Sequence, residues 1–250
     1  MMNFSVFFTV LLFFYSFHAK ALINIEDLRQ SSKNIGFYGE SELSVSGKTG
    51  NKNSREVSIG SHLGYKKKDT DDFLIISVGY EKNDGVLSEK NYEFHLRHVH
   101  AYSRDNVYWE MFAQRSGDDF RALSSRDLLG GGLRLGQKTG DDGRRFYGFG
   151  VFYEEEKLLD NHTSHLLRIN SYFDFRKKLR ENVTLSSVTY FQPDSSRMRD
   201  FRFLEKAKIE VSISNHMGFY LELEVRHDSE PPLNVKKTDV QYTNGLTYEF

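Results

Sequence analysis

Apolar and polar residues alternate along most of this chain, and the alternation is clearest in the last segment, Thr238 to Phe250. Successive side chains of a β-strand point to opposite faces. One face of this segment would therefore carry Val240, Tyr242, Leu246, Tyr248 and Phe250, while polar side chains fill the other. The pattern predicts a strand with one apolar and one polar face at the end of the chain.

Similar alternation recurs from Gly36 onward, in segments close to the roughly 9 to 11 residues that a tilted strand needs to cross a membrane. With the last segment they number about twelve. The other predicted strands are 36–46, 55–66, 73–81, 92–102, 107–115, 128–137, 145–155, 166–176, 183–192, 201–214 and 219–227. The segment 73–81 is apolar on both faces, so its orientation stays open. The sequence predicts an all-β chain forming a single antiparallel barrel, with short periplasmic turns and both termini periplasmic.

The first residues have a different pattern. An apolar run from Phe4 to Phe17 is followed by His18-Ala19-Lys20-Ala21, and it is shorter than the roughly 20 residues of a membrane-spanning helix. It predicts a signal peptide over 1–21, cleaved after Ala21, then a polar lead-in over 22–35 and the barrel over 36–250. No Lys or Arg precedes Phe4, which leaves an uncleaved anchor as the alternative.

Composition agrees with an all-β chain. There are 3 prolines, 19 glycines, 21 phenylalanines and 14 tyrosines, and aromatic residues favour strands whereas proline interrupts them. The absence of cysteine excludes disulfides and cysteine-ligated zinc. The formal net charge is −1 and the basic residues are scattered along the strands, so we do not expect nucleic acid as a partner.

Alternation alone fits both a soluble barrel with an apolar interior and a membrane barrel with an apolar exterior. About twelve strands enclose more space than the roughly eight-stranded barrel that side chains fill. Aromatic residues also recur near strand ends, as in the girdles of membrane barrels; they are Tyr65, Tyr80, Tyr92, Tyr102, Tyr153, Tyr248 and Phe250. We therefore predict a monomeric bacterial outer-membrane barrel in contact with lipid, with a polar lumen.

Charged residues concentrate on the lumenal face of two predicted neighbouring strands. This lumenal ladder comprises Arg202, Lys206, Lys208, Glu210, Glu222, Glu224 and Arg226. A short turn at 214–216 would oppose Lys208 with Glu222 and Lys206 with Glu224, and such pairs each contribute about 0.2 to 1 kcal/mol. The ladder predicts a braced wall, a narrow passage for small solutes or ions, or both.

Two motif regions identify a resemblance. They are Asp118 to Leu123 followed by Leu129-Gly130-Gly131-Gly132-Leu133, and Arg226 to Pro232 followed by Lys236 to Asp239. On these the chain resembles the salt-induced outer-membrane protein family, classed as a domain of unknown function. The resemblance covers essentially the whole mature chain and implies an outer-membrane barrel linked to salt or osmotic stress. It implies no reaction and no cofactor.

The last strand also resembles the C-terminal signal strand of Gram-negative outer-membrane barrels, in which alternate apolar residues end in phenylalanine. The residues that match this pattern are Tyr242, Leu246, Tyr248 and Phe250. The resemblance implies that the barrel-assembly machinery recognises them. An ordinary edge strand at the end of the chain is the alternative interpretation.

Three histidines, His95, His98 and His100, lie close together, and the last two share a strand face. This spacing is compatible with a metal site, but no third ligand on that face is evident. We expect a hydrogen-bonded histidine pair at the membrane interface and no bound metal.

An outer-membrane hydrolase is the alternative function. A loop-built site would unite Asp118 or Asp119 with His162 or His165 and Ser164, in the roles of orienting carboxylate, base and nucleophile. No sequence signature connects these residues, so a channel or structural barrel is the favoured function.

Overall fold

The computed structural model describes residues 35–48, 54–83, 86–102, 106–119, 122–138, 143–232 and 235–250. The predicted signal peptide, and the lead-in except for Ile35, lie outside the described residues, so these two assignments stay predictions. Within the described ranges, no helix has the length and apolar character needed to cross a membrane.

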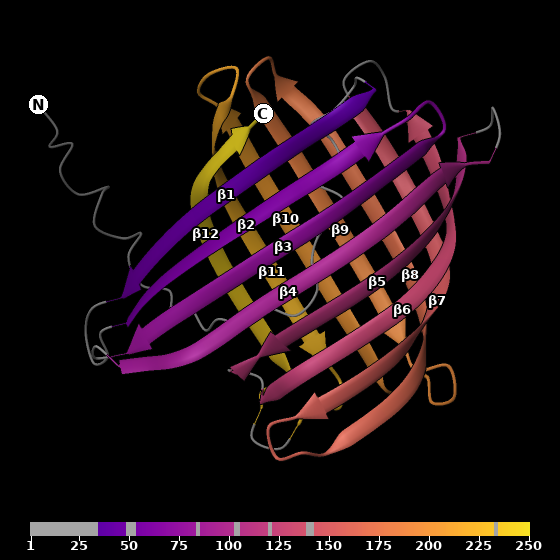
Figure 1. The fold of residues 1–250 in the computed structure, drawn as a ribbon, viewed down its shortest axis with the longest axis vertical. Coiled ribbons are helices and arrows are strands. Elements are labelled where there is room, and N and C mark those ends of the chain that lie inside the picture. The colour runs from indigo at the N-terminus through magenta and orange to yellow at the C-terminus, as the bar shows by residue number, and fades with distance from the viewer. Residues whose placement is uncertain are drawn as a thin grey trace, which may run out of the picture.

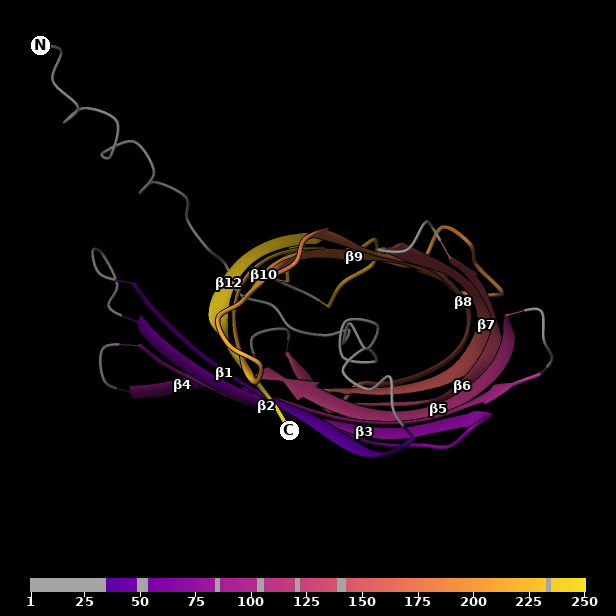
Figure 2. The ribbon, with the colours of Figure 1, turned by 90° about the horizontal axis from the view of Figure 1, so that it is seen from above.

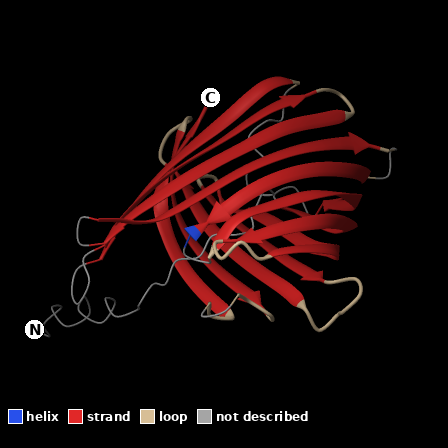
Figure 3. Cartoon of the chain, turned by 60° about the horizontal axis from the view of Figure 1, so that its bottom comes forward, coloured by secondary structure: helices blue, strands red, loops and turns tan. Residues whose placement is uncertain are grey.

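Twelve strands form one closed barrel, in which each strand pairs antiparallel with the next and β1 pairs with β12 (Figures 1 and 3). The strands are β1 Gly36–Lys48, β2 Ser54–Lys66, β3 Thr70–Asn83, β4 Val86–Ala101, β5 Val107–Asp118, β6 Leu123–Lys138, β7 Gly143–Leu158, β8 Thr163–Arg180, β9 Val183–Pro193, β10 Phe201–Ser212, β11 Met217–Asp228 and β12 Thr238–Glu249. The predicted all-β antiparallel barrel is confirmed. Several strands exceed the predicted length, and β8 has 18 residues.

Apolar side chains cover the outside of the wall. On β11, Phe219, Leu221 and Leu223 are exposed on the outer surface, whereas the alternate residues Tyr220 and Glu224 are buried in the lumen. This is the alternation that the sequence predicts for a membrane barrel, because lipid solvates apolar side chains and the lumen solvates polar ones. The outer surface is thus apolar and the inner surface is polar.

The orientation of β3, which its sequence left open, follows from apolar packing inside the lumen. Phe73 and Ile75 point inward and form a buried cluster with Val99 of β4, and Tyr108 packs against that cluster. A strand that is apolar on both faces thus faces the membrane on one side and a small lumenal core on the other.

The even number of strands places the beginning of β1 and the end of β12 at one end of the barrel, here called the turn end. The short connections 67–69, 181–182 and 213–216 lie at the turn end, whereas the longer connections 194–200 and 229–237 lie at the opposite end, called the loop end. These connections match the expected arrangement, although the four-residue connection 159–162 also lies at the loop end.

The seam between β1 and β12 closes the barrel only near the turn end. Pairing runs from Glu40 with Glu249 to Ser44 with Gly245, and beyond that point no pairing of the two strands is recorded in the described ranges. Figure 1 shows the strands diverging there. The backbone groups of Gly39 and Phe250 exchange hydrogen bonds of 3.0 and 3.2 Å, which extends the seam to the last residue.

The lumen is oval in cross-section (Figure 2) and partly filled by side chains that reach across it. The Tyr172 hydroxyl of β8 donates a hydrogen bond of 2.9 Å to Glu110 of β5. A Cβ atom on Gly148 would lie only 1.9 Å from the Tyr172 ring, so glycine there makes room for the ring. Inward glycines in the barrel therefore allow bulky neighbours to enter the lumen.

Candidate functional site in the barrel lumen

The lumenal ladder points inward, as its alternation predicts. Arg202, Lys208, Glu224 and Arg226 are buried, and Lys206, Glu210 and Glu222 are partly buried. The register opposes Lys206 with Glu224 and Lys208 with Glu222. The predicted register is confirmed.

The ion pairs within the ladder are less regular than its register. Lys206 Nζ lies between two carboxylates, 3.1 Å from Glu222 and 3.2 Å from Glu224. Lys208 Nζ lies 3.8 Å from Glu210 and 4.5 Å from the centre of the Tyr220 ring. One lysine thus bridges two rungs, which simple cross-strand pairing does not predict.

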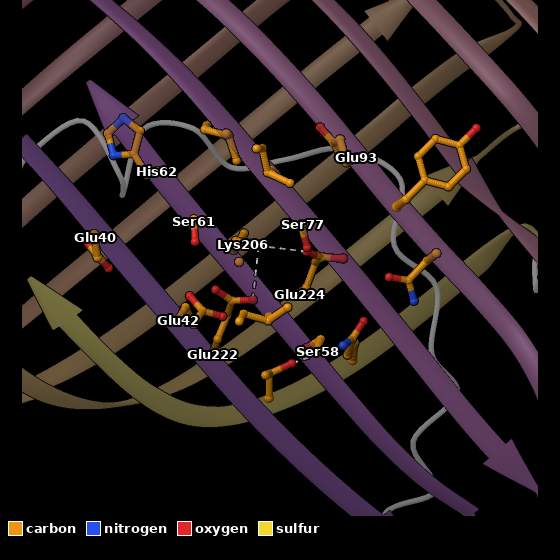
Figure 4. A pocket seen from close by; sticks show the side chains of 18 of the residues that line it. Glu40, Glu42, Ser58, Ser61, His62, Ser77, Glu93, Lys206, Glu222 and Glu224 are labelled. Atoms are coloured by element: carbon orange, nitrogen blue, oxygen red, sulfur yellow. Dashed lines mark hydrogen bonds and ion pairs between the residues drawn. The ribbon is translucent and has the colours of Figure 1, made fainter. Parts of the chain in front are cut away.

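A cavity of about 120 Å³ lies in the middle of the lumen, between β1–β4 on one side and β10–β12 on the other (Figure 4). It has room for several water molecules, since one water needs roughly 10 to 15 Å³. Its charged lining comprises five glutamates and three basic residues: Glu40, Glu42, Glu93, Glu222, Glu224, Lys206, Lys208 and Arg226. We call this site the mid-lumen cavity.

Sequence reasoning identified the β10–β11 half of this cavity and missed the other half. Glu40 and Glu42 of β1, and Glu93 of β4, complete the charged lining, and their connection with the ladder was not predicted from the sequence. The inward direction of these side chains could be predicted from period two. Their meeting with β10 and β11 depends on the curvature of the barrel, which the sequence does not specify.

A second charged region lies at the loop end. Arg202 of the ladder forms its ion pairs in this region. The Arg202 guanidinium contacts Glu154, Glu156 at 2.9 Å and Asp228 at 3.1 Å. Arg126 donates to Glu156 at 2.5 and 2.8 Å. Two strands separate β7 from β10, so the pairs of Arg202 with Glu154 and Glu156 cross the lumen, whereas the pair of Arg126 with Glu156 and that of Arg202 with Asp228 join neighbouring strands. We call the group the loop-end cluster; it comprises Arg126, Arg168, Arg202, Glu154, Glu156, Asp200 and Asp228.

The connections 194–200 and 229–237 are joined at the loop end. Arg197 contacts Glu230 at 2.9 Å and Asp200 at 2.9 Å, and Arg168 anchors Asp200 to the wall at 3.1 Å. Burial raises the pKa of Asp194, but hydrogen bonds from Ser196 and nearby arginines outweigh it and hold that pKa below its usual value. These ion pairs link the connection 194–200 to the wall and to Glu230.

A small hollow of about 20 Å³ separates the second connection from the wall. Its lining includes Pro231 and Pro232 on one side and Leu123 and Leu158 on the other. Leu123 begins β6 and Leu158 ends β7, whereas the prolines follow β11. The connection 229–237 therefore reaches toward a distant part of the wall and narrows the loop end.

The histidines do not form a metal site in the part of the chain that the structure describes. His98 and His100 point outward beside Trp109, and the His98 ring lies 2.5 Å from Asp72 of the neighbouring strand. His95 points into the lumen, where its ring contacts Gln114 at 2.9 Å. The partner of His98 is thus a carboxylate from β3; the His98 and His100 rings stack 6.4 Å apart, and no hydrogen bond between the two is found among the described residues, so the expected hydrogen-bonded pair is not formed there.

The residues of the hydrolase alternative lie on different faces of the wall. Ser164 points inward on β8, whereas His165 points outward, where its ring contacts the Tyr153 hydroxyl at 2.9 Å. His162 is exposed in the connection before β8, and Asp118 is buried at the end of β5. Asp119 accepts a hydrogen bond of 3.2 Å from the Lys90 amide. Consecutive strand residues cannot share a face, so Ser164 and His165 are not brought together.

The residues of the proposed assembly signal share the outer face of β12. Tyr242, Leu246, Tyr248 and Phe250 are all exposed there. The Phe250 ring lies against Gly39 of β1, where an added Cβ atom would come within 2.4 Å of it. This geometry makes Phe250 part of the closing seam, and recognition by the assembly machinery stays a prediction.

Closed barrels of antiparallel strands with apolar exteriors and charged lumens are the fold of outer-membrane barrel proteins. The chain belongs to the family described as "Protein of unknown function, DUF481", whose model matches residues 41–250. This match confirms the part of the resemblance that placed the chain in a family classed as a domain of unknown function. No curated protein matches the sequence.

Solved structures with the same fold are distant in sequence. An outer membrane channel from Pseudomonas putida F1 has a TM-score of 0.57 at 7% identity, covering 88% of this chain and 97% of that chain. NanC porin has a TM-score of 0.54 at 8% identity, covering 85% and 100%. The translocator domain of the autotransporter NalP from Neisseria meningitidis has a TM-score of 0.51 at 11% identity, covering 90% and 92%. These similarities establish the fold and no more.

Proposed function

We propose that this protein is a monomeric outer-membrane barrel whose lumen is a narrow passage for small ions or solutes. The observation that carries the proposal is the mid-lumen cavity. It has room for several water molecules and is lined by charged side chains inside a closed wall. Charged rings and polar linings determine which solutes pass a pore. The structural neighbours that are a channel and a porin support the same class of function.

The outer surface supports a membrane location. Leu129, Phe149 and Leu221 are exposed by 67%, 65% and 55%, and they lie on separate parts of the wall. Continuous apolar surface of this kind is not stable in water. In the proposed arrangement it contacts outer-membrane lipid after the predicted signal peptide has been removed.

The passage is narrow because side chains and loop-end connections occupy much of the lumen. Tyr172 reaches β5, and the loop-end cluster joins β7 to β10. We therefore expect a conductance well below that of a wide general porin. A narrow passage with a braced wall fits the role in salt or osmotic stress that the family resemblance implies.

Planar-bilayer recording of the purified, folded barrel tests the proposal. We expect small, discrete conductance steps in potassium chloride. A boiled sample, which lacks the folded barrel, is the control and should give no steps. If folded protein inserts without any conductance above that control, the barrel is a closed structural element and the proposed passage is wrong.

A further inference from the structure

Two buried acceptor atoms in the mid-lumen cavity have no hydrogen-bond partner among the described residues. They are Oε1 of Glu93 on β4 and Oε1 of Gln241 on β12, and both residues line the cavity. Glu93 is 7% exposed and Gln241 is 5% exposed. A buried acceptor without a partner is destabilising, so most such atoms in proteins are hydrogen-bonded. The two oxygens are therefore available to a ligand that donates hydrogen bonds.

The charges around these oxygens favour a cation as that ligand. Five carboxyl groups and three basic groups line the cavity, so acidic side chains outnumber basic ones by two. The basic groups already have partners. Lys206 lies between Glu222 and Glu224, Lys208 lies 3.8 Å from Glu210, and Arg226 contacts Glu224. An anion would thus meet engaged cations and an excess of acidic side chains, whereas a cation would meet unmatched acceptors.

We propose that the mid-lumen cavity binds a small primary-amine cation, with Glu93 and Gln241 accepting hydrogen bonds from its ammonium group. An ammonium group supplies three donors and a positive charge. Both oxygens are acceptors, so a cation that forms hydrogen bonds with them has to supply the donors. A short diamine carries two positive charges and matches the excess of two acidic side chains.

This inference rests on the proposed function, because it names the kind of solute that the lumen accepts. Its test is independent of conductance. Isothermal titration calorimetry with the folded barrel in non-ionic detergent measures the binding of 1,4-diaminobutane, and 1,4-butanediol is the neutral control of the same length. We expect saturable binding of the diamine and none of the diol.

Variants separate this site from other carboxylates. Glu93→Gln should weaken diamine binding about tenfold or more, because it removes a charge-assisted hydrogen bond. Gln241→Met should weaken it less. Glu205→Gln is the matched control, since Glu205 lies on β10 but contacts the outward hydroxyls of Ser187 and Thr189. The affinity of Glu205→Gln for the diamine should equal that of the unsubstituted protein.

Several results would overturn the inference. Equal affinity of Glu93→Gln and the unsubstituted protein would exclude the site, and equal weakening by Glu205→Gln would indicate non-specific charge attraction. Saturable binding of calcium chloride without binding of the diamine would identify a different ligand class. If Glu93→Gln does not show the heat-modifiable migration of a folded barrel, the affinity of Gln241→Met for the diamine becomes the test, and an unchanged affinity would exclude the site. A barrel that conducts but binds no diamine refutes only this inference, and one that binds the diamine without conducting refutes only the passage.

Discussion

The loop-end cluster and the mid-lumen cavity use charged side chains in opposite ways. In the loop-end cluster, Arg202 alone contacts three carboxylates, and Arg126 and Arg168 neutralise the same group. In the mid-lumen cavity, Glu93 retains an unmatched oxygen although charged groups surround it. Matched charges fix the positions of strands and loops, whereas unmatched charges leave a capacity to bind. The difference fits the proposed function, in which the loop end braces the wall and solutes meet the cavity.

The largest effect should come from breaking the loop-end cluster. Arg202→Met removes the guanidinium shared by Glu154, Glu156 and Asp228, and leaving buried carboxylates unmatched typically costs about 3 to 5 kcal/mol. The urea midpoint of unfolding in detergent should fall accordingly. Arg197→Met is the control at the same end; Arg197 is more exposed, so its loss should cost less than about 1 kcal/mol. Equal midpoints for the two variants would remove the structural role assigned to the cluster.

The next effect tests which side of the wall meets lipid. Leu221→Arg places a charge on the outer face of β11, where a basic residue costs about 2 to 4 kcal/mol near the membrane midplane. Folding yield in lipid vesicles should drop strongly. Lys208→Glu on the inner face is the comparison and should reduce the yield far less. If both variants fold equally well, the assignment of inner and outer faces is wrong.

Part of this picture could be predicted from the sequence and part could not. Period-two alternation is a local property, so it correctly predicted the number of strands and the inward direction of the ladder, and the short turn between two strands correctly predicted the register of Lys206 with Glu224. The contact of Arg202 with Glu154 is not local, because it depends on how β7 and β10 face each other across an oval barrel. The same holds for Glu93, which reaches the ladder only after the barrel closes.

A smaller effect concerns assembly through the short seam. Deleting Phe250 removes backbone hydrogen bonds to Gly39 and the aromatic end of the predicted assembly signal. The amount of folded protein in outer-membrane fractions should fall several-fold. The variant Phe250→Tyr, which keeps the backbone and an aromatic ring, should retain most of the amount seen for the unsubstituted protein. Unchanged levels after the deletion would show that neither the seam nor the signal depends on this residue.

The smallest effect is expected at Glu205, the outward carboxylate on β10. Hydroxyl groups of Ser187, at 2.7 Å, and Thr189 donate to its two carboxylate oxygens. A neutral amide can accept one of these bonds with its oxygen and donate to the other hydroxyl with its NH2 group, since a hydroxyl also accepts. Glu205→Gln should therefore change the free energy of unfolding by less than about 1 kcal/mol, as measured by urea titration. A larger loss would mean that the charge itself is required on the outer face.

The most direct test of the central claim, that solutes pass the charged cavity, is ion selectivity across a planar bilayer. Lys206→Glu combined with Lys208→Glu replaces two of the three basic groups that line the cavity. In a potassium chloride gradient, the reversal potential of this double variant should shift toward the potassium equilibrium potential. A reversal potential identical to that of the unsubstituted protein would contradict the claim and leave the ladder with a bracing role alone.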